Sequence, residues 1–200
     1  MIVLLPTEEA ALIAYIVSFS FLCDVNTCKK RIADIIRQHG KLITRIVYRG
    51  HSKKDPRITS RTPFFSVSPD KGLALLFLEH TIEEGHIGNL FKLHLKRVPT
   101  LDTHDIKYTF SKEVVDELRT LVKQIPIQEG IDEKKYNTIE EYLPKLKKTL
   151  RDLLDGGDGT ELLILNGGRF YTDASMTEEG DITTNHSKGY TLHEAWYSFL

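Results

Sequence analysis

The chain has 200 residues, 28% of them charged, with a formal net charge of -1 at pH 7. This length is that of one domain and is sufficient to bury a sizeable core. Apolar residues make up 40% of the sequence, which disfavours disorder as its main state. Because the charge is nearly balanced, the chain offers no basic field to a polyphosphate backbone, and general nucleic-acid binding is disfavoured.

The apolar stretch near the N-terminus predicts a buried helix. Ala10–Cys23 is shorter than the roughly 20 residues that a membrane-spanning helix needs. Glu8 and Glu9 precede it where a signal peptide would have basic residues. We therefore expect a helix at Thr7–Leu22, with Thr7 as its N-cap and no association with a membrane.

The two cysteines, Cys23 and Cys28, are too few for a secreted disulfide scaffold. We expect two partly buried free thiols, which suit a reducing compartment. Because a secretion signal is not recognised, we expect the protein to work in a cytoplasm, either that of the producing cell or that of a host. Histidines at metal-binding spacing on a helix are absent from the sequence, and turn chemistry accounts for the acidic loop Asp155–Gly159. We predict no metal site.

Periodicity and capping signals then predict an α+β fold in which helices dominate the first half and strands the second. Gly40 ends the second helix, and Ser68 and Thr138 are predicted helix caps. The expected strands are Leu42–Tyr48, Phe64–Ser68, Leu90–Val98, Glu161–Leu165 and Gly189–Leu200, and the further helices are Thr27–His39, Ser68–His80, Ser111–Lys123 and Thr138–Leu154. We expect one domain over residues 1–200.

Three short motifs on strands carry candidate chemistry. Tyr48-Arg49-Gly50 places an arginine, whose planar fork matches phosphate oxygens, before a glycine that allows a ligand to approach the backbone. A solvated arginine at a strand end is the alternative.

The second motif is Phe64-Phe65-Ser66-Val67-Ser68, in which alternation places Ser66 and Ser68 on one face. Ser68 is accounted for as a helix cap, whereas Ser66 has no such structural role. The alternative for Ser66 is a half-buried serine whose hydroxyl is satisfied locally.

The third motif is Glu161-Leu162-Leu163-Ile164-Leu165, in which a glutamate opens an otherwise apolar strand. Glu161 lies either at the mouth of a groove or in a buried position that is costly without a partner. Placement at an exposed strand edge is the alternative.

In this order, the three motifs resemble those of mono-ADP-ribosyltransferases of the Arg-Ser-Glu class. Arg49 corresponds to the arginine of an early strand, and Ser66-Val67-Ser68 to the Ser-Thr-Ser strand ahead of a helix. Glu161 corresponds to the glutamate at the head of an apolar strand, followed by the return at Asn166–Phe170. The resemblance implies N-terminal helices packed on a mixed, mostly antiparallel two-sheet β core.

The resemblance also implies the function, which is cleavage of the nicotinamide–ribose bond of NAD and transfer of ADP-ribose to a macromolecular acceptor, expected to be protein. Glu161 would be the catalytic residue, and Arg49 would bind the diphosphate. The backbone of Gly50 would hold the carboxamide, and Ser66 would bind the ribose or orient Glu161. Ser68 and Phe65 complete the expected NAD-binding residues, with core packing as the alternative for Phe65.

Two positions depart from the family's pattern. Val67 replaces the middle threonine of Ser-Thr-Ser, and Gly159 stands where arginine-modifying members carry Glu or Gln, two residues before the catalytic glutamate. The resemblance therefore supports cleavage of NAD better than it supports an arginine acceptor. Hydrolysis of NAD by water, and a catalytically inactive fold used as a binding module, remain alternatives.

Overall fold

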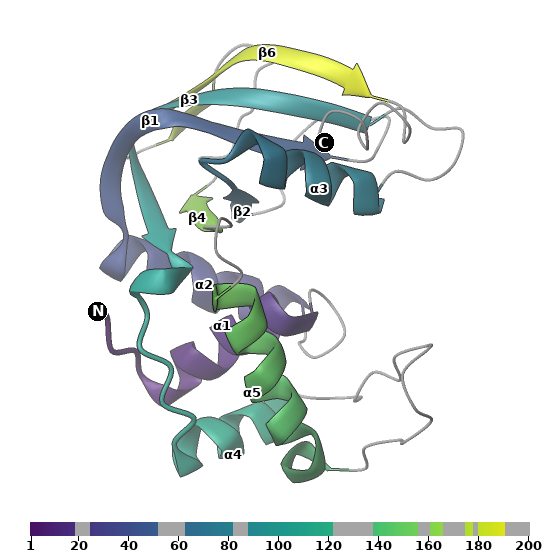
Figure 1. Ribbon diagram of the computed structural model, residues 1–200. Coiled ribbons are helices and arrows are strands. Elements are labelled where there is room, and N and C mark those ends of the chain that lie inside the picture. Colours follow the sequence, from purple (N-terminus) through teal and green to yellow (C-terminus); the bar gives the residue numbers. More distant parts are fainter. Residues whose placement is uncertain are drawn as a thin grey trace. The chain divides into compact units, whose positions relative to one another are not determined.

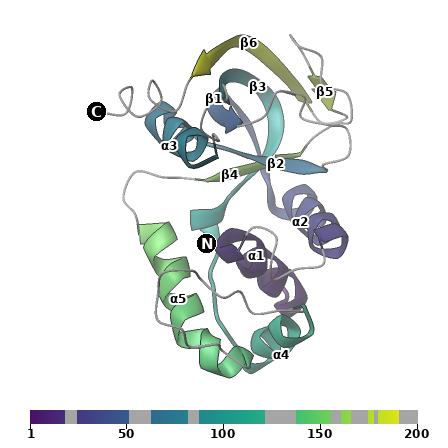
Figure 2. The same ribbon diagram turned by 90° about the vertical axis from the view of Figure 1, so that its right-hand side faces the viewer.

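The computed structural model describes residues 1–18, 25–51, 63–81, 88–121, 138–155, 161–165, 175–177 and 180–190. The chain divides into two compact units, Met1–Ile35 with Asp105–Gly157 and Ile36–His104 with Asp158–Leu200. A single domain over residues 1–200 stays a prediction. The elements, in chain order (Figures 1 and 2), are α1 (Pro6–Ser18), α2 (Val25–His39), β1 (Lys41–His51), β2 (Phe64–Val67), α3 (Lys71–Thr81), β3 (Gly88–Asp102), the 3₁₀ turn η1 (Thr103–Asp105), α4 (Lys112–Leu121), α5 (Ile139–Asp155), β4 (Leu162–Leu165), β5 (Ser175–Thr177) and β6 (Gly180–Tyr190).

In the first unit, helix α1 packs against α4 and α5. It begins at Pro6, so the expected N-cap at Thr7 is wrong. The side chain of Glu8 reaches back instead, and its Oε2 accepts the backbone N–H of Leu5 at 2.9 Å. This contact satisfies a donor that the helix itself leaves without a partner, and it fixes the first turn.

A buried carboxylate connects α1 to the segment that leads into α4. Glu9 is 1% exposed and accepts the backbone N–H of Thr109 at 2.6 Å, the Thr109 hydroxyl at 2.8 Å and the backbone N–H of Phe110 at 2.9 Å. Because three donors surround the carboxylate, its burial is compensated. The burial of a carboxylate at Glu9 is therefore explained by its structural role in joining α1 to the segment before α4.

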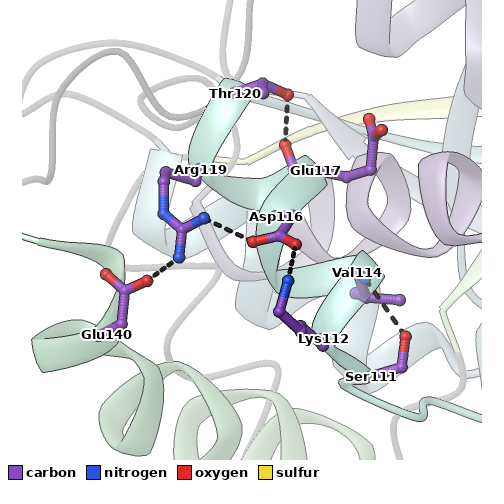
Figure 3. Close-up of polar contacts among 8 residues, drawn as sticks. All are labelled: Ser111, Lys112, Val114, Asp116, Glu117, Arg119, Thr120 and Glu140. Carbon is purple, nitrogen blue, oxygen red and sulfur yellow. Dashed lines mark hydrogen bonds and ion pairs between the residues drawn. The ribbon is translucent and has the colours of Figure 1, made fainter.

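Helices α4 and α5 start as expected, with the Ser111 hydroxyl accepting the N–H of Val114 and the Thr138 hydroxyl accepting that of Glu141, both at 3.3 Å. Figure 3 shows Arg119 of α4 between Asp116 of the same helix and Glu140 of α5. These charges are exposed, so solvent and salt screen them and their contribution to stability is small.

Helix α2 buries Ile32, Ile35 and Ile36 on one face, as its periodicity predicts. It ends at Gly40, whose N–H donates to the carbonyl of Ile36 at 2.8 Å. The expectation for the cysteines is wrong, because Cys28, which is buried, is disulfide-bonded. The only other cysteine of the sequence is Cys23, which lies outside the described residues. The cysteines therefore no longer argue for a reducing compartment.

The second unit contains a sheet in which all pairs between the described strands are antiparallel. Strand β3 is its centre, since it pairs with β1 along most of its length, with β6 through its first part and with β4 through its last three residues. Strand β2 pairs with β4, and β5 with β6. The β5 strand was not expected from the sequence, and β6 overlaps only the first two residues of the segment Gly189–Leu200 where a closing strand was expected. Of that segment, residues 191–200 lie outside the described residues.

The expectation of a mixed, two-sheet core is wrong for the described strands, which form one six-stranded sheet. The reason is the length of β3, whose 15 residues continue from the β6 pairing into the β4 pairing. A bulge between them places Lys96 and Arg97 opposite Thr44, with Arg97 at a φ of 55°. The N–H of Arg97 donates to the Thr44 hydroxyl at 3.0 Å. Bulges bend strands locally, so the sheet changes direction here without ending.

Helix α3 covers one face of β1 and β3 (Figures 1 and 2). Its N-cap is Asp70, whose Oδ1 accepts the N–H of Leu73 at 2.8 Å, so the expected cap at Ser68 is wrong. The Ser68 hydroxyl accepts the N–H of Asp70 at 3.0 Å instead, in the turn that precedes the helix.

Candidate active site

The strands that carry the three motifs close on themselves around a shared core. β1 pairs with β3, β3 with β4 and β4 with β2, and β2 returns to β1 through a bridge between Tyr48 and Ser68. Each of these two residues donates its N–H to the other's carbonyl, at 2.7 and 2.9 Å. The enclosed core is apolar and consists of Val47, Phe65, Val67, Phe91, Leu93, Leu95, Val98, Leu162 and Ile164.

This closure brings Ser66 and Glu161 together, although 95 residues separate them in the sequence. Ser66 lies opposite Leu163 in the β2–β4 register, and Glu161 is two residues before Leu163, so both face the same side. The Ser66 hydroxyl donates to Oε1 of Glu161 at 2.6 Å. This distance is typical of a charge-assisted hydrogen bond to a carboxylate.

Arg49 reaches the same point from β1. Its Nη1 donates to the carbonyl oxygen of Ser66 at 2.5 Å, and its guanidinium carbon lies 5.4 Å from the centre of the Phe65 ring. Arg49 is thus held by β2 on two sides, through a hydrogen bond and a cation–π contact. It fixes the strand segment that presents Ser66, and this contribution was not expected from the sequence.

The partly buried carboxyl of Glu161 is electrostatically perturbed. Burial raises the pKa of Glu161 above its ordinary value, while the hydrogen bond from Ser66 and the charge of Arg49 act in the lowering direction. The raising effect of desolvation is the larger. A nearby positive charge strongly stabilises the ionised form of a carboxylate that burial has desolvated. A perturbed pKa beside a specific charge partner is typical of functional sites.

The other predicted binding residues have clear structural contacts. Gly50 lies against α3, where a Cβ atom would come within 2.3 Å of the carbonyl oxygen of Ala74 and 2.7 Å of Cβ of Leu78. Phe65 is buried in the core, and Ser68 is buried at the bridge to β1. Contacts of these three with NAD stay predictions. The return expected at Asn166–Phe170 lies outside the described residues.

One residue at the site was missed by sequence reasoning. Thr103, the first residue of η1, donates both its hydroxyl, at 3.1 Å, and its N–H, at 3.4 Å, to the carbonyl oxygen of Glu161. A single threonine after a strand carries no local signal of this role. Only the pairing of β3 with β4, which is a long-range feature, places it there.

Within the described ranges, no three His, Cys, Asp or Glu side chains gather in a way that could hold a metal ion. The helices of the same ranges include none that is both long enough and apolar enough to cross a membrane.

No family model matches the sequence, and no curated protein matches it. Among solved structures, the chain is similar to one in the crystal structure of the M. tuberculosis MbcT-MbcA toxin-antitoxin complex, with 10% sequence identity and a TM-score of 0.42. The similarity covers 84% of this chain and 96% of the other. A similarity at this level leaves the function to be argued from the site itself.

Proposed function

We propose that the chain is an NAD-dependent mono-ADP-ribosyltransferase that cleaves the nicotinamide–ribose bond and transfers ADP-ribose to a macromolecular acceptor, a protein. The observation that carries the proposal is the convergence of Arg49 from β1, Ser66 from β2 and Glu161 from the residue before β4, with Ser66 hydrogen-bonded to both of the others. The motif order alone does not require any of these contacts.

The chemistry fits NAD as the substrate. Cleavage of an N-glycosidic bond passes through an oxocarbenium-like state, in which positive charge develops on the ribose, as in glycoside hydrolysis. A fixed carboxylate stabilises that charge more than it stabilises the neutral ground state, which is the role of Glu161. The leaving nicotinamide needs no proton, so one carboxylate is sufficient.

The surrounding residues support the same role for Glu161. Its partly buried position weakens solvent screening of its charge, and Ser66 holds one of its two carboxylate oxygens. We expect the other oxygen to bind the substrate's ribose. Arg49 supplies the positive charge that suits the diphosphate of NAD, beside the strand that it already supports.

The direct test is release of nicotinamide from NAD by the purified full-length chain. We expect release in the wild type that depends on Glu161, and incorporation of labelled ADP-ribose into protein when a lysate is added. A chain that binds NAD but releases no nicotinamide would be an inactive binding module, and the proposal would be wrong.

Hydrolysis with water as acceptor is the second candidate, because Gly159 provides no side chain where arginine-modifying relatives carry an acid or amide. Gly159 lies outside the described residues, so this candidate depends on the sequence alone. Nicotinamide release without label on any protein would favour it. Efficient ADP-ribosylation of agmatine by the wild type would instead show that a guanidino acceptor is used without that side chain.

A further inference from the structure

The backbone of Glu161 is held from the side opposite to Ser66. In the β3–β4 pairing, Asp102 lies opposite Leu162, and one further step of the same register brings Thr103 opposite Glu161. Glu161 itself stands immediately before β4, beyond the last residue pair of the ladder. Its carbonyl therefore depends on the two donors of Thr103, the hydroxyl at 3.1 Å and the longer N–H contact at 3.4 Å.

We infer that Thr103 is a positioning residue for the reaction, which holds the main chain of Glu161 so that its carboxylate meets Ser66 and the developing charge of the substrate. This inference rests on the proposed function. Thr103 is 1% exposed, so its hydroxyl is confined to this contact region and water does not compete for it.

The two anchors act on different parts of the same residue. Ser66, from β2, holds the side chain, whereas Thr103, from the turn η1 that follows β3, holds the backbone from which that side chain extends. Catalytic groups must be held to within a fraction of an ångström, and loss of a supporting contact reduces turnover more than it reduces substrate binding. Thr103 therefore affects kcat and leaves the KM for NAD nearly unchanged.

The chain offers both an isosteric variant and a matched control. Thr103→Val retains the shape and the backbone N–H but lacks the hydroxyl, and Thr103→Ser keeps the hydroxyl. Thr100 is the control, because it is a buried threonine of β3 whose hydroxyl donates to the carbonyl of Val98 at 3.0 Å, away from Glu161. Thr100→Val thus removes a buried threonine hydroxyl from the strand that directly precedes Thr103, without touching the site.

We expect Thr103→Val to lower kcat by about 5- to 15-fold, the effect of one lost hydrogen bond on the barrier, with KM for NAD within about twofold of wild type. Thr103→Ser and Thr100→Val should each retain kcat to within about twofold. The inference is overturned if Thr103→Val turns over as fast as Thr100→Val, or if Thr103→Ser is as slow as Thr103→Val.

A second measurement does not depend on activity. The pKa of Glu161, read from a carboxyl carbon titration by NMR, should rise in Thr103→Val, because a displaced carboxylate loses part of the hydrogen bond from Ser66 and part of the attraction of Arg49. It should stay at its wild-type value in Thr100→Val. If the wild type releases no nicotinamide, the proposed function fails, and this titration alone decides whether Thr103 positions Glu161. A pKa that does not move in Thr103→Val overturns the inference.

Discussion

Substitution of Glu161 by glutamine separates its charge from its shape. The glutamine carbonyl can still accept the Ser66 hydroxyl, which lies 2.6 Å from Oε1 in the native protein. What is lost is the negative charge opposite the oxocarbenium. Removal of one such preorganised group costs about 100- to 1,000-fold in kcat, or roughly 3–4 kcal/mol of barrier. NAD binding should largely survive.

The same variant should be more stable than the wild type at neutral pH. Burial raises the pKa of Glu161 in the folded state, so the favourable contribution of its protonated form is present at low pH and is lost as the pH rises through the folded-state pKa. Above the folded-state pKa the wild type therefore buries a charge, at a cost of about 1.4 kcal/mol for each pH unit by which the folded pKa exceeds the unfolded one. Glutamine removes this cost, so its advantage should shrink as the pH falls through the folded-state pKa and should be gone below the ordinary value of 4.5.

The assay is nicotinamide release with a parallel melting curve at two pH values. Asp102→Asn is the matched control, since Asp102 is a partly buried carboxylate at the end of β3 whose Oδ1 accepts the N–H of His104 at 2.9 Å. Asparagine retains that acceptor, so kcat should stay within about threefold of wild type. Activity of Glu161→Gln within about threefold of wild type would refute the assignment, and a lower melting temperature at pH 7 would refute the electrostatic argument.

Two further substitutions test the partners of Glu161. Arg49→Lys keeps one charge but can contact either the Ser66 carbonyl or a phosphate, so the Kd for NAD, measured by calorimetry, should rise about 10- to 100-fold with little change in the melting curve. An unchanged Kd would leave Arg49 a structural residue only. Ser66→Ala removes the hydroxyl that lowers the pKa of Glu161, so the acidic limb of the kcat profile should move to higher pH, and activity at pH 6 should fall more than at pH 8. If the acidic limb of the kcat profile stays at its wild-type pH, the Ser66 hydroxyl does not lower the pKa of Glu161.

Local chemistry predicted much of the fold. Thr138 caps its helix and Gly40 ends α2 as expected, because each of these signals acts within one helical turn. Alternation also placed β3 correctly, although the strand continues to Asp102 rather than ending at Val98. At the start of α3, two residues compete for the cap. Asp70 caps the helix, because the backbone N–H and carbonyl of Ser68 already pair with Tyr48 in the bridge to β1.

The sequence selected the candidate residues of the site but not the contacts between them. Arg49, Ser66 and Glu161 could be selected from motif order, whereas the bridge between Tyr48 and Ser68 that brings β1 to β2 has no local signal in the sequence. The bulge at Arg97 bends β3 locally, and a positive φ at an arginine has no sequence signal either. The hydrogen bonds between the three motifs, and the anchor at Thr103, are consequences of this long-range register.

Substitution of Gly50 by alanine tests whether packing alone requires a glycine in the first motif. A Cβ atom there would lie 2.3 Å from the carbonyl oxygen of Ala74 and 3.0 Å from the backbone N of Leu78. Both atoms belong to the backbone of α3, so a rotamer change cannot relieve the contact, and β1 or α3 must shift. We expect Gly50→Ala to cost about 1–3 kcal/mol of unfolding free energy, as overpacked substitutions do.

For a chain of this size, that cost corresponds to a fall in melting temperature of roughly 2–12 °C. Leu75→Ala, in the buried face of α3, supplies a variant of comparable instability that leaves β1 intact. If packing is the whole reason for the glycine, the two variants should lose NAD affinity equally at a temperature where both are folded. A selective loss of affinity in Gly50→Ala would show that the strand next to Arg49 must keep its position for the ligand. If Gly50→Ala melts at the same temperature as the wild type, a Cβ atom at this position fits beside α3 and the packing argument is wrong.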